Sequence, residues 1–215
     1  MLTYPMHIAG LDRELPVCRI NDDLYIGAFI VFGDAELTVA CARELLKLVP
    51  ADSYDYMLTA EAKSIPLIHE MARQSGATKY FIARKGPKAY MPDPIHVVDH
   101  SITTAGDQEL YLGRDDADLI RGKRILLMDD VISTGGSLHA MEALVAEAGG
   151  TVAGRIAVLA EGDAQKRSDI KFLAPLPLFN ADGTPKKYRK RNRGLSGLGS
   201  FLICRPLRGF SLPFL

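Results

Sequence analysis

The chain has 215 residues, of which 47% are hydrophobic and 24% are charged, and its formal net charge is zero. This balance is typical of a globular α/β domain, and it excludes a disordered chain and a protein whose whole surface binds nucleic acid. No apolar run approaches the roughly 18 residues that a membrane-spanning helix needs, and the polar N-terminus has no signal-peptide core. Cys18, Cys41 and Cys204 are too widely spaced for a disulfide framework or a zinc site, so we expect a cytoplasmic protein.

The N-terminal part of the chain is expected to contain two short strands and one helix. Residues 15–20 and 24–32 are predicted strands joined by a polar turn. Asp34 is a suitable N-cap for an amphipathic helix over residues 35–48. We therefore distinguish an N-terminal segment, residues 1–33, from the main domain that follows it.

Strands and helices alternate in the next part of the chain. Residues 54–59 and 79–83 are predicted strands, and a helix over residues 66–74 connects them. Residues 84–113 break this alternation with a polar, proline-rich stretch, which we interpret as a long excursion of two extended arms. An acidic linker over residues 115–118 leads into the next strand.

The most informative stretch combines a buried strand, two acids, a small-residue loop and a helix. Ile125–Met128 is an apolar run of the kind that is buried on both faces of a parallel sheet, and Asp129 and Asp130 follow it directly. A predicted helix over residues 138–148 comes after the loop. The loop consists of Ser133, Thr134, Gly135, Gly136 and Ser137. Peptide N–H groups at the start of a helix bind an anion, and neighbouring carboxylates suit sugar hydroxyls, so this stretch predicts a sugar-phosphate site.

The remaining elements complete an α/β fold. Residues 151–159 are a predicted strand, and residues 169–174 and 176–179 are predicted edge strands. Alternating strands and helices indicate a central, mostly parallel sheet with helices on both faces. We assign this domain to residues 34–182.

The composition changes after the main domain. Eight of the 26 basic residues and none of the 26 acidic residues lie within residues 186–215, which leaves 18 basic against 26 acidic residues upstream. We predict that residues 183–215 form a basic, poorly ordered C-terminal extension. An arm that binds nucleic acid or another partner is the alternative that the basic run leaves open.

The stretch from Ile125 to Ser137 resembles the phosphoribosyl-diphosphate (PRPP) signature of type I phosphoribosyltransferases. It has four apolar residues, two acids, three variable residues, Thr-Gly and two further small residues. The resemblance extends over residues 15–180 and implies a three-layer, Rossmann-like fold with a small N-terminal hood and a flexible loop. It implies transfer of the 5-phosphoribosyl group from PRPP to a nucleobase, with release of diphosphate, in nucleotide salvage. The first expectation for the acceptor is adenine or another purine.

The resemblance also implies roles for individual residues. The loop from Ser133 to Ser137 would hold the 5′-phosphate. Asp129 and Asp130 would bind ribose hydroxyls and hold Mg²⁺, which keeps several waters and therefore needs few carboxylates. The diphosphate would be held by basic residues that follow two predicted strands, namely Lys63, Arg84, Lys85 and Lys88.

The residue that transfers a proton is harder to assign. The 6-oxopurine branch of the family has an acid where this chain has Ser133, which argues against that branch. Adenine phosphoribosyltransferases use a Glu-Tyr pair in the hood loop, where this chain has Thr103-Thr104. Asp107 or Glu109 would therefore have to serve as the catalytic acid or base.

Other assignments stay open from the sequence. The layout of residues 83–112 also resembles xanthine phosphoribosyltransferases, but Glu161 is followed by Gly162 instead of the lysine expected there. A PRPP-binding regulator without transferase activity is the main alternative function, and a pyrimidine- or thiopurine-like acceptor is another. The expected partners are PRPP, a nucleobase, diphosphate and a second copy of the chain in a homodimer. We expect no membrane partner, and nucleic acid only if the basic tail binds it.

Overall fold

The structure is a computed structural model, and it describes residues 2–99 and 108–186. Its centre is a five-stranded sheet with strand order β10-β9-β8-β4-β5, in which all neighbouring strands are parallel. These strands are β4 (Tyr56–Ala60), β5 (Phe81–Ala83), β8 (Arg124–Ile132), β9 (Thr151–Glu161) and β10 (Lys171–Leu176). The predicted α/β fold with a parallel central sheet is confirmed.

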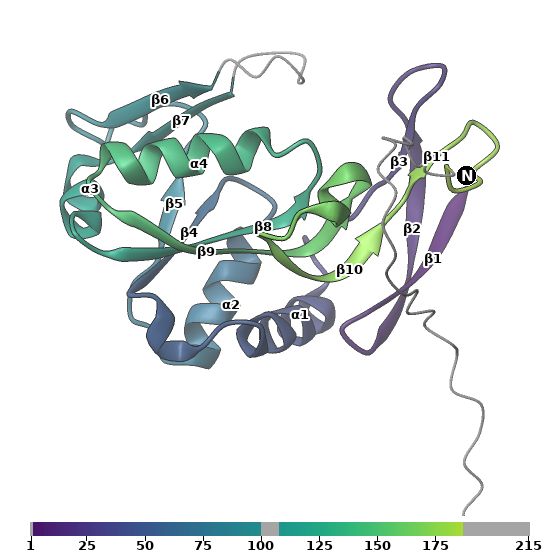
Figure 1. The fold of residues 1–215 in the computed structure, drawn as a ribbon, viewed down its shortest axis with the longest axis horizontal. Coiled ribbons are helices and arrows are strands. Elements are labelled where there is room, and N and C mark those ends of the chain that lie inside the picture. Colours follow the sequence, from purple (N-terminus) through teal and green to yellow (C-terminus); the bar gives the residue numbers. More distant parts are fainter. Residues whose placement is uncertain (1, 100–107, 187–215) are drawn as a thin grey trace, which may run out of the picture.

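Two helical layers cover the sheet (Figure 1). Helices α1 (Ala35–Lys47) and α2 (Ile65–Ser75) lie on one face, and α3 (Arg114–Ile120) and α4 (Gly136–Glu147) lie on the other. Each layer has its own apolar core. Leu126 and Met128 pack in the core of α1 and α2, whereas Ile125 and Leu127 pack in the core of α3 and α4. Successive side chains of β8 point to opposite faces, which explains why its stretch Ile125–Met128 is apolar at every position.

A second, smaller sheet stands beside the main one and contains both ends of the described chain. Its four strands have the order β1-β2-β3-β11 and are antiparallel. They are β1 (Thr3–Ile8), β2 (Leu11–Arg19), β3 (Tyr25–Gly27) and β11 (Leu178–Phe179). β1 was not predicted, and β11 joins this N-terminal hood instead of the edge of the main sheet. Phe179 is fully buried there and contacts Tyr4 edge to face, so its apolar side chain finds its partners in the hood.

The excursion after β5 forms an antiparallel ribbon of β6 (Ile95–Asp99) and β7 (Gln108–Leu112). The ribbon lies against α4 in Figure 1, and its buried residues belong to the core of α3 and α4. Backbone hydrogen bonds of 2.8 Å in both directions between Arg84 and Tyr111 attach it to the end of β5. The two predicted arms are therefore confirmed. The loop tip with Thr103, Thr104 and Asp107 lies outside the described residues.

Several elements differ from the sequence prediction, and the strand expected over residues 24–32 is limited to β3, Tyr25–Gly27. The expected acidic linker is helix α3, because Asp115 and Asp116 favour a helix N-terminus and Ala117 and Ile120 are buried. Helix α4 begins at Gly136, two residues earlier than predicted. Two short 3₁₀ helices, η1 (Ala51–Ser53) and η2 (Gly162–Lys166), complete the elements.

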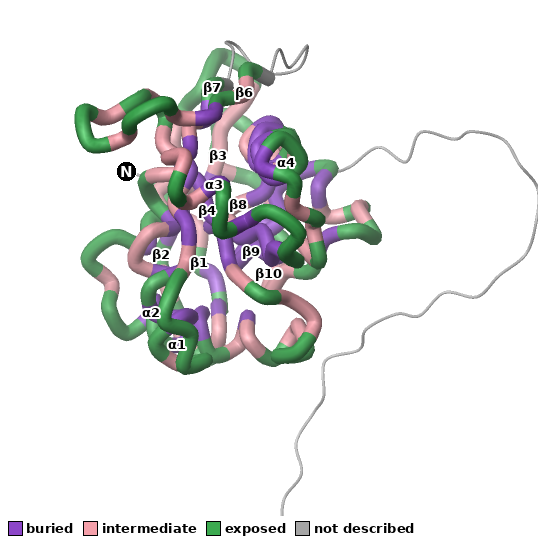
Figure 2. Tube along the Cα trace, turned by 90° about the vertical axis from the view of Figure 1, so that its left-hand side faces the viewer, coloured by how far each residue is buried: buried purple, intermediate pink, exposed green. Residues whose placement is uncertain are grey.

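Many residues of β8, β9 and α4 are buried (Figure 2). No helix within residues 2–99 and 108–186 is long and apolar enough to cross a membrane. The predicted C-terminal extension lies outside the described residues from 187 onward, so its structure stays a prediction.

Candidate functional site

Four polar segments leave the carboxyl ends of neighbouring parallel strands and therefore meet at one edge of the sheet. They are residues 61–64 after β4, residues 84–88 after β5, residues 129–137 at the end of β8, and residues 161–167 at the end of β9. This edge contains every described residue that the sequence analysis assigned to the site except Glu109.

The loop between β8 and α4 encloses a small cavity of about 110 Å³. The cavity is lined by Asp129 and by every residue from Val131 to Leu138. Gly135 has a φ of +91°, which turns the chain into α4, and no side chain in the described structure caps this helix. The first N–H groups of α4 are therefore available to an anion, and the helix dipole favours one there.

Ser64 holds the two acids in place. Its hydroxyl donates to Asp129 Oδ1 at 3.0 Å and accepts the backbone N–H of Asp130 at 2.9 Å. Ser64 immediately precedes α2 and is itself buried. These hydrogen bonds connect Ser64 with residues that lie 65 and 66 positions further along the chain. The sequence analysis did not assign Ser64 to the site.

The electrostatics of the two acids differ. Burial and the neighbouring Asp130 carboxylate raise the pKa of Asp129 above the usual carboxyl range. Asp130 instead has a counter-ion, since Lys63 Nζ lies 2.7 Å from its Oδ2. That oxygen is buried and has no hydrogen-bond donor of good geometry among the described residues. A buried carboxylate oxygen with this environment fits a hard cation such as Mg²⁺, which takes its remaining ligands from water and phosphate.

The other basic residues gather around Glu61. Arg84 Nε lies 2.8 Å from Glu61 Oε2, Lys88 Nζ lies 3.8 Å from Oε1, and the backbone N–H of Lys85 donates to Oε1 at 2.6 Å. The side chain of Lys85 is exposed. Glu61 thus connects the segments after β4 and β5. The sequence analysis missed it, although an acid within a basic loop is a recognisable signal for a counter-ion.

Glu161 is a further site residue that the sequence analysis did not assign. It is buried at the end of β9. Burial raises its pKa, while a hydrogen bond from Ser133 and the charge of Lys63 oppose this effect. Its signal in the sequence is the same as that of Asp129, an acid at the end of an apolar strand.

Glu109 lies apart from these residues, on the ribbon. Leu110 and Leu112 are buried against α4, so Glu109 and Tyr111 project from the opposite face of β7. Tyr111 Oη donates to Glu109 Oε2 at 2.9 Å, and this bond raises the pKa of Tyr111. His96 stacks on the Tyr111 ring at 5.2 Å between centroids.

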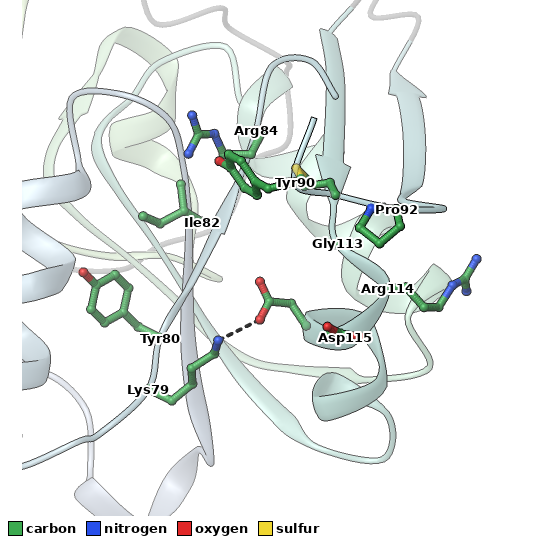
Figure 3. Close-up of a pocket in the computed structure, with 11 residues that line it drawn as sticks. Lys79, Tyr80, Ile82, Arg84, Tyr90, Pro92, Gly113, Arg114 and Asp115 are labelled. Atoms are coloured by element: carbon green, nitrogen blue, oxygen red, sulfur yellow. Dashed lines mark ion pairs between the residues drawn. The ribbon is translucent and has the colours of Figure 1, made fainter. Parts of the chain in front are cut away.

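A larger cavity of about 380 Å³ lies outside this edge, between β5 and the start of α3 (Figure 3). An ion pair of 2.7 Å between Lys79 and Asp116 crosses it. Of the predicted site residues, Arg84 is the one that lines it. The cavity volume alone would therefore not have located the phosphate loop.

Fold and geometry together define the class of protein. A parallel sheet carries an uncapped helix N-terminus, two adjacent acids and two basic loops at its carboxyl edge, which is the arrangement of a protein that binds a phosphorylated sugar. The family model of the phosphoribosyl transferase domain matches residues 51–177, more than half of the chain. The chain belongs to this family.

Individual relatives agree with this family. An adenine phosphoribosyltransferase of Mycobacterium avium (strain 104) is 38% identical over 171 residues, which are 80% of this chain and 89% of that protein. Another, from Corynebacterium jeikeium (strain K411), is 38% identical over 99 residues, 46% of this chain and 45% of that protein. The crystal structure of adenine phosphoribosyltransferase from Rhodothermus marinus DSM 4252 superposes with a TM-score of 0.56 and 24% identity, covering 68% of this chain and 83% of that one, and shows the same fold.

Proposed function

We propose that this chain is a Mg²⁺-dependent phosphoribosyltransferase that transfers the 5-phosphoribosyl group from PRPP to a purine, adenine first, and releases diphosphate. The observation that carries the proposal is the cavity of the phosphate loop, which opens beside Asp129 at an uncapped helix N-terminus. Family membership and relatives named adenine phosphoribosyltransferase support it. These relatives favour transferase activity over the alternative of a PRPP-binding regulator.

The binding roles follow from the position of each group. The N–H groups and hydroxyls of residues 133–137 hold the 5′-phosphate. Asp129 and Asp130 accept hydrogen bonds from the ribose hydroxyls and would also hold Mg²⁺. The diphosphate is bound by four basic residues, namely Lys63, Arg84, Lys85 and Lys88. Arg84 donates paired N–H groups, and the lysines act as mobile charges.

In the reaction, a purine nitrogen forms a bond to the anomeric carbon while the bond to diphosphate breaks. Related glycosyl transfers pass through an oxocarbenium-like transition state. A bound Mg²⁺ would supply positive charge to the leaving diphosphate. The chain itself orients the ribose through Asp129 and Asp130, fixes the phosphate at the far end, and neutralises the leaving group with Lys63 and Arg84.

The proton of the purine requires an acceptor, for which Glu109 or Asp107 remains our proposal. Glu109 projects from the face of the ribbon opposite to α4, so the ribbon would have to close over the site for it to act. Glu109→Gln is expected to lower kcat by about 10²–10⁴-fold, the usual contribution of a general base, with little change in the KM for PRPP. Steady-state kinetics test this, with Glu147→Gln at the exposed end of α4 as control. Full activity of Glu109→Gln would shift the assignment to Asp107.

Ser64→Ala tests the support of the two acids. It removes a buried hydroxyl that makes two hydrogen bonds, so we expect the free energy of unfolding to fall by about 1–3 kcal/mol and the KM for PRPP to rise. Urea denaturation and initial rates measure the two effects. Ser53→Ala is the control, because the only hydrogen bond of the Ser53 hydroxyl within the described part of the chain is to the backbone oxygen of Pro50, in the exposed η1. Unchanged stability together with unchanged KM would show that Ser64 does not support the acids.

The function itself is tested with a panel of nucleobases. The full chain is incubated with PRPP, Mg²⁺ and each base, and diphosphate release is measured, with a metal-free series beside it. Release with adenine above all other bases is the expected result. Release with a pyrimidine or thiopurine would correct the acceptor, and PRPP binding without release from any base would favour the regulator. We further propose that the enzyme is a cytoplasmic homodimer, which light scattering coupled to size-exclusion chromatography tests.

A further inference from the structure

Arg167 reaches the phosphate loop from outside the signature stretch. It follows η2, beyond the end of β9. The position that a Cβ atom on Gly135 would occupy lies 2.9 Å from Arg167 Nη1. The guanidinium therefore contacts the loop at the residue that immediately precedes α4.

The orientation of this guanidinium is fixed by one carboxylate. Asp169 Oδ1 accepts a hydrogen bond from Arg167 Nε at 3.0 Å, and Asp169 Oδ2 accepts one from Arg167 Nη2 at 2.7 Å. This two-point ion pair uses one side of the planar group and directs Nη1 to the loop. Nη1 has no acceptor among residues 2–99 and 108–186.

The phosphate loop has no positive side chain of its own. Residues 133–137 offer peptide N–H groups and hydroxyls. Among the described residues, the lining of their cavity includes an acid, Asp129, but no lysine or arginine. A phosphate monoester carries a charge of about −1.5 to −2 at pH 7. Arg167 brings a cation into contact with this loop at Gly135, and hydrogen bonds that involve a charged partner are roughly twice as strong as neutral ones.

We propose that Arg167 is a ligand of the 5′-phosphate through Nη1, and that Asp169 is its positioning residue. The inference rests on the proposed function, since it adds a residue to the phosphate subsite of that reaction. It also gives Gly135 a second role besides its positive φ, because any side chain at position 135 would displace Nη1 from the loop.

The chain provides a matched control for this proposal. Arg155 on β9 pairs with Glu142, and its Nε lies 3.8 Å from the same Asp169. Neither arginine lines the loop cavity, but only the Arg167 guanidinium, among the described residues, lies within 4 Å of the Cβ position of Gly135. Arg155→Met thus removes an arginine from the same ion-pair cluster without removing the contact with the loop.

The test measures binding by calorimetry to the full chain, with ribose 5-phosphate and diphosphate as separate probes. Arg167→Met is expected to weaken ribose 5-phosphate binding about tenfold to a hundredfold, the usual effect of losing a charge-assisted bond, and to leave diphosphate binding within twofold. Arg167→Lys should recover part of the loss, and Arg155→Met should bind both probes like the wild type. In kinetics with PRPP, Arg167→Met should raise KM and leave kcat nearly unchanged, because the phosphate is bound equally before and during the reaction.

The outcomes separate this inference from the proposed function. If the wild type binds both probes and Arg167→Met binds ribose 5-phosphate equally well, the role of Arg167 is refuted and the proposed function stands. Equal weakening of both probes, with a lowered unfolding temperature, would show that Arg167 is only structural. If the wild type binds neither probe, both the proposed function and the inference fail.

Discussion

The variant Asp129→Asn with Asp130→Asn is expected to lose turnover of PRPP while remaining at least as stable as the wild type. Each carboxylate is placed to bind the ribose and the metal, and removal of one electrostatic group from an active site costs on the order of 10²–10³-fold in kcat. Loss of both should bring activity to background. Diphosphate release under saturating PRPP and adenine measures it.

The expected stability follows from the pKa of Asp129. Burial and Asp130 raise this pKa in the folded protein, so the folded state binds a proton that the unfolded chain releases, and wild-type stability falls as the pH rises above the usual carboxyl range. In the double variant position 129 has no carboxyl group, so this loss of stability with rising pH is absent. Thermal unfolding at neutral pH should shift upward by about 2–4 °C for each kcal/mol recovered.

The control for this variant is an exposed acid. Asp118 lies on α3 and pairs with Arg121 at the surface, so Asp118→Asn should change neither activity nor stability appreciably. A double variant that is folded and fully active would refute the assignment of the acids. A folded variant with a lowered unfolding temperature would instead refute our account of Asp129.

Gly135→Ala is expected to raise the KM for PRPP tenfold or more. Alanine at a φ of +91° is strained by roughly 1–2 kcal/mol, and its Cβ would lie 2.9 Å from Arg167 Nη1. The loop and the guanidinium cannot both keep their places, so the cradle for the phosphate is distorted. Initial rates over a range of PRPP concentrations measure the effect.

A glycine at the other end of the same helix provides the control. Gly149 follows α4, has a φ of +78°, and a Cβ there would meet Arg121 Cγ at an ordinary 3.5 Å. Gly149→Ala should cost similar stability and leave the KM for PRPP unchanged. Equal effects of the two variants on KM would mean that Gly135 acts through stability alone.

Acids of the site pair with its basic residues. Lys63 pairs with Asp130, and Arg84 pairs with Glu61. On the proposed function, Asp130 would hold Mg²⁺, which would supply positive charge there, and Lys63 would then be available to the diphosphate. These ion pairs hold the two basic segments at the edge of the sheet where the diphosphate would bind.

Most of the main domain could be predicted from local patterns. The helix predicted over residues 35–48 is found at 35–47, with Asp34 accepting the N–H of Leu37 as its N-cap. The strand, acids and loop of residues 125–137 lie as the signature implied. These features depend on residues close in the chain, because capping, strand burial and a strand-to-helix turn are determined within a few positions.

Contacts between distant residues were decided only by the tertiary structure. Ser64 meets Asp129 across 65 positions, β11 joins the hood through β3, and Arg167 reaches Gly135 from beyond the next strand. None of these follows from periodicity or a motif. The contacts of Ser64 and Arg167 depend on how parallel strands bring their carboxyl ends together, and β11 pairs antiparallel with a strand that lies far away in the sequence. The signature determined the family and the phosphate loop, whereas the packing of the sheet determined which further side chains surround them.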